Sequence, residues 1–265
     1  MREYFWNFSK IMWIKAHPSE YELFLFEKTK KYSKYISWIP WLKMIAVCNS
    51  LSMYATKEYE NSPKKNLKSL NYFWNQEKAF AQVMKEKWWS DIDLFIITAH
   101  NRMWFVRLMV TLIFQILGVR RHWNKINSRF CLSFFISENA MNFSTFAIED
   151  DIYLYFWIYY LKPIINKDHT YESFIKSNKS LWINELNLHW DNKVYIMKTK
   201  DYNKWLDENR FLDYIDKFLK YIFLPITLKH KKRLWDPYGI IVSDDILKFH
   251  DNDRRVEIRK ELRGY

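Results

Sequence analysis

With 265 residues, 49% of them hydrophobic, the chain can bury a full core, so we expect a folded protein of one large domain or two modest ones. The formal net charge of +12 favours polyanionic partners, among them nucleoside triphosphates, RNA and an anionic membrane surface. Two cysteines, Cys48 and Cys131, exclude a disulfide framework, and the most apolar segment, residues 103–118, is too short for a spanning helix, which needs about 20 residues. Because no secretory signal is visible, the cytoplasm is the expected location.

The first elements in chain order are two helical stretches and a strand. Residues 1–35 mix aromatic and charged side chains in a helical pattern, which predicts a helical N-terminal appendage with Glu22 on its solvated side. Residues 41–48, WLKMIAVC, are rich in strand formers and predict a buried strand. Asn49 and Ser50 then open a turn and a short helix.

The middle of the chain predicts two further strands. Residues 59–89 are typical of a helical insert, and residues 91–97, DIDLFII, predict a second buried strand. A helix is expected over 101–117 and should end at Gly118, since glycine is the commonest residue just after a helix. Residues 130–137, FCLSFFIS, predict the third strand.

Beyond residue 140 the pattern becomes helical. Residues 150–165, 171–188 and 211–224 carry apolar side chains at spacings of three and four. We therefore expect an α+β fold, with a mixed sheet and flanking helices over 36–140 and a helical C-terminal domain over 141–265.

Asp91 and Asp93 are the sharpest candidates for chemistry. Residues two apart on a strand project from the same face, so the two carboxylates should lie together. Paired carboxylates suit Mg²⁺, and like charges this close need a cation or a raised pKa. The alternative is a solvated strand end whose aspartates only make hydrogen bonds.

The order of strand, Asn49-Ser50 turn and SDIDLFII resembles the nucleotidyltransferase superfamily, which includes DNA polymerase β-like and antibiotic-modifying enzymes. A closer likeness is to uncharacterised bacterial nucleotidyltransferase-domain proteins, in the stretches IPWLKMIAVCNSLSM, SDIDLFIITAHNRMWFVRLMVTLIFQILGVRRH, INSRFCLSFFISENA and SDDILKFHDNDRR. The resemblance implies a nucleotidyltransferase-like sheet, with Asp91 and Asp93 as catalytic ligands of Mg²⁺ or Mn²⁺ and with Asn49 and Ser50 as contacts to the nucleotide phosphates.

The chain departs from that family pattern at three places. Asn49 stands where the turn usually has glycine, and Asp91 follows Ser50 by 41 positions, where the family has a short connection. No carboxylate occurs on the third strand, where Ser133 is the expected equivalent and Glu138 lies beyond the strand end. Two functions therefore remain open. One is metal-dependent transfer of a nucleotidyl group from a nucleoside triphosphate to an unknown acceptor, and the other is a catalytically inactive relative that binds nucleotide or RNA.

Three basic segments are weaker candidates. Arg120 and Arg121 suit a triphosphate, because guanidinium groups bind phosphate with two hydrogen bonds, but they equally suit a solvated turn. Residues 250–255, HDNDRR, carry atoms for metal or phosphate contact or form a tail that docks on the domain. A membrane surface, reached through the basic amphipathic stretch 211–233, is the least favoured partner.

The glycine and tryptophan contents are unusual. The chain has 3 Gly and 14 Trp, whereas average glycine usage is about 7%. An AT-rich gene would deplete glycine without enriching tryptophan, and Trp123 stands in a turn where tolerance of a positive φ is expected. Our hypothesis is that some tryptophan codons are UGA, read as glycine in the source organism, with Trp88 and Trp89 as further candidates.

Overall fold

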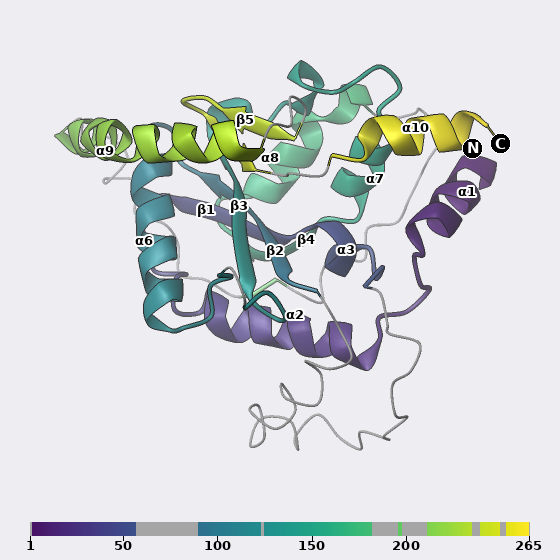
Figure 1. Ribbon diagram of the computed structural model, residues 1–265. Coiled ribbons are helices and arrows are strands. Elements are labelled where there is room, and N and C mark those ends of the chain that lie inside the picture. The colour runs from purple at the N-terminus through teal and green to yellow at the C-terminus, as the bar shows by residue number, and fades with distance from the viewer. Residues whose placement is uncertain are drawn as a thin grey trace.

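The computed structural model describes residues 2–56, 90–122, 125–181, 196–197, 211–234, 239–249 and 253–264. In these ranges one mixed sheet has the strand order β4 (Lys162–Asn166), β1 (Leu42–Val47), β2 (Ile92–Thr98), β3 (Phe130–Ser137), β6 (Ile246–Phe249) and β5 (Ile240–Val242) (Figure 1). The helices of the same ranges are α1 (Arg2–Met12), α2 (Glu20–Ser33), α3 (Asn49–Ser52), α6 (Met103–Ile116), α7 (Ile152–Tyr159), α8 (Thr170–Ser177), α9 (Phe211–Leu234) and α10 (Arg255–Arg263). The expected α+β class with a mixed sheet is confirmed, and the insert predicted over 59–89 lies outside the described residues.

The three strands predicted from apolar runs are all present as β1, β2 and β3. β2 pairs parallel with β3, and the other neighbouring pairs of the sheet are antiparallel. Parallel neighbours need a crossover connection, which the predicted helix α6 supplies between β2 and β3. The N-terminal ends of β2 and β3 therefore lie side by side.

Each face of the sheet carries its own hydrophobic core. Leu94 and Ile96 of β2 belong to a core that includes α2 and α6, whereas Phe95 and Ile97 belong to a core that includes α7, α8 and α10. Successive side chains of a strand point to opposite faces of the sheet, and here the side chains on both faces are buried. Asp93 is two residues before Phe95 and so shares the face that α7 covers.

The C-terminal region is not helical throughout, which corrects the prediction of a helical domain over 141–265. β4, β5 and β6 come from this region and extend the sheet at both of its edges. The helix expected over 150–165 ends at Tyr159, and β4 follows. Pro163 gives the reason, because proline disfavours helix both at its own position and at the residue before it, and it is tolerated in an edge strand such as β4.

The helices predicted for residues 1–35 are present, but α2 packs into the core. Tyr21 is almost completely buried, and Glu22, which we expected on the solvated side, is fully buried. The Glu22 carboxylate accepts a hydrogen bond from the Thr56 hydroxyl at 2.6 Å and pairs with the Lys15 ammonium at 3.0 Å. A buried charge needs such partners, so α2 is tied to the segment that follows α3.

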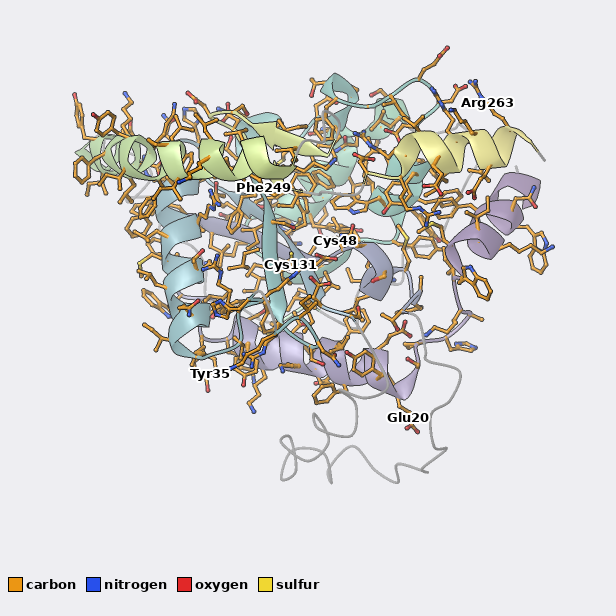
Figure 2. The ribbon with its side chains drawn as sticks, in the orientation of Figure 1. Glu20, Tyr35, Cys48, Cys131, Phe249 and Arg263 are labelled. Atoms are coloured by element: carbon orange, nitrogen blue, oxygen red, sulfur yellow. The ribbon has the colours of Figure 1, made fainter. Side chains whose placement is uncertain are left out.

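The two cysteines are free, and Figure 2 shows both labelled in the middle of the molecule. Cys48 is buried and Cys131 is half-buried. No disulfide framework is present, as their number predicts.

The long helix α9 exposes aromatic side chains. Tyr214, Phe218 and Tyr221 are 70%, 62% and 80% exposed. None of the helices in the described part of the chain combines the length and the apolar character that crossing a membrane requires. Contact with a membrane surface stays a prediction.

Gly118 ends α6 as predicted. Its φ is 65°, in the left-handed region. The Gly118 amide donates to the Gln115 carbonyl and the Val119 amide to the Phe114 carbonyl, both at 3.0 Å. This pair of bonds is the Schellman motif, in which the left-handed residue is usually glycine.

Trp13 ends α1 with the same motif. Its φ is 58°, its amide donates to the Lys10 carbonyl at 3.2 Å, and the Ile14 amide donates to the Ser9 carbonyl at 2.9 Å. A left-handed conformation costs a residue with a side chain about 1–2 kcal/mol. Trp13 therefore has the same backbone conformation and hydrogen-bond pattern as Gly118, and glycine is the residue usually found at such a position.

The reassigned-codon hypothesis gains a structural argument from two tryptophans. Trp13 and Trp41 both have left-handed φ, at 58° and 64°. Trp88, Trp89 and Trp123 lie outside the described residues. We predict that the gene carries UGA at positions 13 and 41; reading UGG at both would contradict the hypothesis.

We predict that Trp13→Gly raises the free energy of unfolding by about 1 kcal/mol, because it relieves the left-handed strain at an exposed site. The measurement is urea denaturation followed by circular dichroism. Trp6→Gly is the matched control, since Trp6 is similarly exposed but lies inside α1, where glycine costs about 1 kcal/mol. A loss of stability in both variants would refute the assignment of Trp13 to a glycine position.

Candidate functional site

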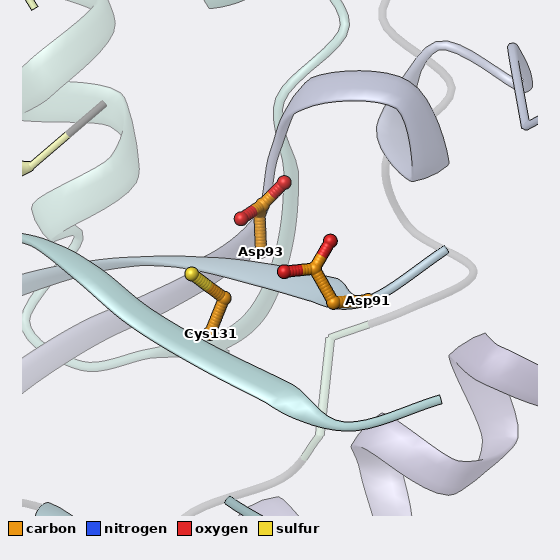
Figure 3. A group of neighbouring side chains, drawn as sticks. All are labelled: Asp91, Asp93 and Cys131. Carbon is orange, nitrogen blue, oxygen red and sulfur yellow. The ribbon is translucent and has the colours of Figure 1, made fainter. Parts of the chain in front are cut away.

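Asp91, Asp93 and Cys131 form one cluster at the start of β2 and β3. One ligand atom from each lies within 4.8 Å of the others (Figure 3). Asp93 lies on β2 directly opposite Cys131 on β3, and Asp91 immediately precedes β2. The structure therefore brings together the two carboxylates chosen from the sequence and adds a thiol.

The third group of the cluster is the Cys131 thiol, whereas Ser133 was the position expected for a third carboxylate. Cys131, rather than Ser133, pairs with Asp93, because the register shifts further along the strands, where Phe95 faces Phe134. Glu138 follows the far end of β3. The pairing of a parallel strand is set by distant segments, so no local signal in FCLSFFIS singles out Cys131.

Asn49 holds Asp93 in place. Its φ is 58°, a left-handed value that asparagine tolerates better than most residues, so it fills the position where glycine was expected. Its amide nitrogen donates to the Asp93 carboxylate at 2.9 Å, and its amide oxygen accepts from the Trp157 indole at 2.7 Å. Both ends of the side chain are engaged, which suits orienting Asp93. Ser50 is half-buried beside it in α3.

Arg121 pairs with the cluster. Its guanidinium donates to the Asp91 carboxylate at 2.7 Å and approaches the Cys131 sulfur at 3.7 Å. The side chain is 43% exposed, so it is free to move away. Arg120 is half-buried beside it, and burial lowers the pKa of its guanidinium. The basic turn after α6 thus lies beside the cluster, with the Arg121 side chain still partly in solvent.

The electrostatics of the cluster disfavour two negative charges. Burial and then the neighbouring Asp91 raise the pKa of Asp93 to about 7, against the lowering effects of the Asn49 hydrogen bond and Arg121. Burial is also the largest cause that raises the pKa of the Cys131 thiol far above its usual value, so the thiol stays protonated. A divalent cation beside the two carboxylates would stabilise their charged forms.

The donor set fits Mg²⁺ or Mn²⁺ through Asp91 and Asp93. Carboxylate oxygens are the preferred protein ligands of these ions, and substrate phosphates commonly complete the shell. Thiolate ligands suit softer metal ions, so Cys131 is less suited than the two carboxylates to bind Mg²⁺ or Mn²⁺.

Compared with protein-family models, with curated proteins and with solved structures, the chain matches none. The nucleotidyltransferase resemblance therefore rests on its motifs, and membership of that family stays a prediction.

The C-terminal segment docks on the domain. Residues 250–252 lie outside the described part, but Arg255 pairs with Asp151 at 3.0 Å and with Asp253 at 2.9 Å, and Lys248 pairs with Asp253 at 3.1 Å. These side chains are nearly buried, so their charges need one another. Of the two interpretations of this segment, the described residues support a docking tail.

We predict that Asp253→Asn lowers the free energy of unfolding by about 3 kcal/mol at pH 7, because it leaves buried cations without their partner. Although burial raises the pKa of Asp253, the Arg255 and Lys248 contacts lower it to about 2 from its usual 3.8. Because the pKa of Asp253 is lower in the folded than in the unfolded chain, its carboxylate stabilises the fold above pH 4, and this stabilisation is lost as the pH falls toward 2. Urea denaturation from pH 7 to pH 2 should show the difference between the variant and the wild type shrinking over that window.

The control for this measurement is Asp244→Asn, whose side chain is 77% exposed beside Lys220. It should change the free energy of unfolding by less than about 0.5 kcal/mol at any of these pH values. Equal effects of the two variants would contradict the role given to Asp253.

Proposed function

We propose that this chain transfers a nucleotidyl group from a nucleoside triphosphate to an acceptor, with Mg²⁺ or Mn²⁺ bound by Asp91 and Asp93. The observation that carries the proposal is the convergence of the two carboxylates on one side of β2, with the pKa of Asp93 raised to about 7. Such a pair is unfavourable by itself and becomes favourable with a cation. The net charge of +12 supports a polyanionic substrate.

Each neighbouring residue has a part in this proposal. A bound cation would neutralise charge on the transferred phosphoryl group. Asn49 would keep the Asp93 carboxylate oriented through its 2.9 Å hydrogen bond. Arg121, which pairs with Asp91, would turn to the phosphates once a cation occupies the carboxylates, because the two cations would repel each other. Ser50 and Arg120 remain candidates for phosphate contact.

The second candidate is a nucleotide- or RNA-binding protein without catalysis. Cys131 supports it, because a protonated thiol faces Asp93 where a third carboxylate would be expected in an active relative. No other acidic residue joins the cluster in the described ranges. A missing general base would leave binding intact while removing the chemical step.

We predict that the wild type binds labelled nucleoside triphosphates only with Mg²⁺ or Mn²⁺ and releases pyrophosphate when supplied with an extract of small molecules and RNA as acceptors. Asp93→Asn should lower turnover by about 100-fold or more, since it removes a ligand of the cation. Asp244→Asn, an exposed carboxylate away from the cluster, is the matched control and should not change it.

Cys131→Asp separates the two candidates. If the wild type binds nucleotide without releasing pyrophosphate and only Cys131→Asp gains turnover, the chain is a binding protein that lacks a third carboxylate. If neither protein binds any nucleotide with either cation, both candidates fail.

A further inference from the structure

A pocket of about 130 Å³ adjoins the carboxylate cluster, on the face of the sheet that α7 covers. Its walls come from β3, α7, β6, α10 and the start of α3. Four of the candidate site residues predicted from the sequence line this pocket: Asn49, Asp253, Arg254 and Arg255. The other candidates in the described part of the chain do not.

Asn49 joins the pocket to the cluster. It lines the pocket, donates to Asp93 at 2.9 Å and accepts from Trp157, another wall residue, at 2.7 Å. The same side chain therefore lines the pocket and contacts the Asp93 carboxylate.

The walls suit a flat ring. Phe134, Phe146, Tyr153 and Trp157 line the pocket, and aromatic side chains offer stacking surfaces to any base. An apolar cavity of about 150 Å³ holds one benzene ring. At about 130 Å³ the space in the pocket is closer to the size of one six-membered ring than to the fused rings of a purine.

Tyr153 supplies a polar group in this wall. Burial is the largest cause that raises the pKa of the Tyr153 hydroxyl, so this hydroxyl stays protonated and able to donate. The nearby cations are engaged, since Lys248 pairs with Asp253 and Arg254 pairs with Glu257.

The charges around the pocket are paired. Lys248, Arg254 and Arg255 line it together with one acid, Asp253. Lys248 and Arg255 pair with Asp253, Arg255 also pairs with Asp151, and Arg254 pairs with Glu257, so a ring in the pocket would not lie beside an unpaired cation.

We propose that this pocket binds the base of the nucleoside triphosphate and selects pyrimidines, with the Tyr153 hydroxyl donating to the 2-carbonyl that cytosine and uracil share. The proposal rests on the proposed function, because it places the base of that substrate. The two remain separable, because a nucleoside without phosphates can test the pocket without the cation.

The test is to measure binding of CTP, UTP, ATP and GTP with Mg²⁺, and of cytidine without a cation, by titration calorimetry. CTP and UTP should bind about tenfold more tightly than ATP and GTP, because the purines lack the 2-carbonyl and match the size of the pocket less well. Cytidine should bind to the wild type without a cation and equally to Asp244→Asn, which changes an exposed carboxylate that does not line the pocket.

Two variants test the wall residues. Tyr153→Phe keeps the ring and removes the hydroxyl, so binding of cytidine, CTP and UTP should weaken about fivefold. Phe146→Ala enlarges the pocket, so the preference for pyrimidines over purines should shrink. Tyr159→Phe is the matched control, because Tyr159 lies on the same helix α7 but does not line the pocket, and it should leave binding unchanged.

The outcomes distinguish the two claims. Equal affinity for all four triphosphates, with no effect of Tyr153→Phe, would overturn the pocket assignment and leave the proposed function standing. Binding of cytidine without metal-dependent binding of CTP would contradict the proposed function alone. Should Phe146→Ala fail to fold, Tyr153→Phe decides, since it changes only one atom.

Discussion

The parallel pairing of β2 with β3 is the constraint on which the candidate site depends. It places Cys131 directly opposite Asp93 and brings the basic turn after α6 to the same end of the sheet, where Arg121 reaches Asp91 at 2.7 Å. The crossover through α6 makes this possible, because parallel neighbours start at the same edge. Two chain segments that are separated by a whole helix thus contribute groups of opposite charge to one place.

The main electrostatic feature of the candidate site is the repulsion between the adjacent carboxylates of Asp91 and Asp93. Burial and the charge of Asp91 raise the pKa of Asp93 to about 7, while Asn49 and Arg121 act in the opposite direction. Arg121 and a divalent cation would stabilise the same charges. A cation bound there would therefore release the Arg121 guanidinium, which could then contact a phosphate.

The C-terminal half completes the site from the other side. α7 provides Trp157, which fixes Asn49, and the buried ion pairs of Arg255 hold α10 against the loop before α7. Because β6 pairs with β3, Lys248 also reaches the pocket wall. A region that the sequence predicts to be a helical domain is therefore part of the sheet, of the core and of the pocket.

Strong local patterns in the amino-acid sequence determined the central elements. Apolar runs predicted β1, β2 and β3, the spacing of Asp91 and Asp93 predicted paired carboxylates, and Gly118 predicted a helix end, since each depends on neighbours in the chain. Edge strands of three to five residues, such as β4 and β5, carry too little pattern and form because a strand edge is available to pair with them. The partners Cys131 and Trp157 likewise follow from register and packing, which arise between segments far apart in sequence and so required the folded chain.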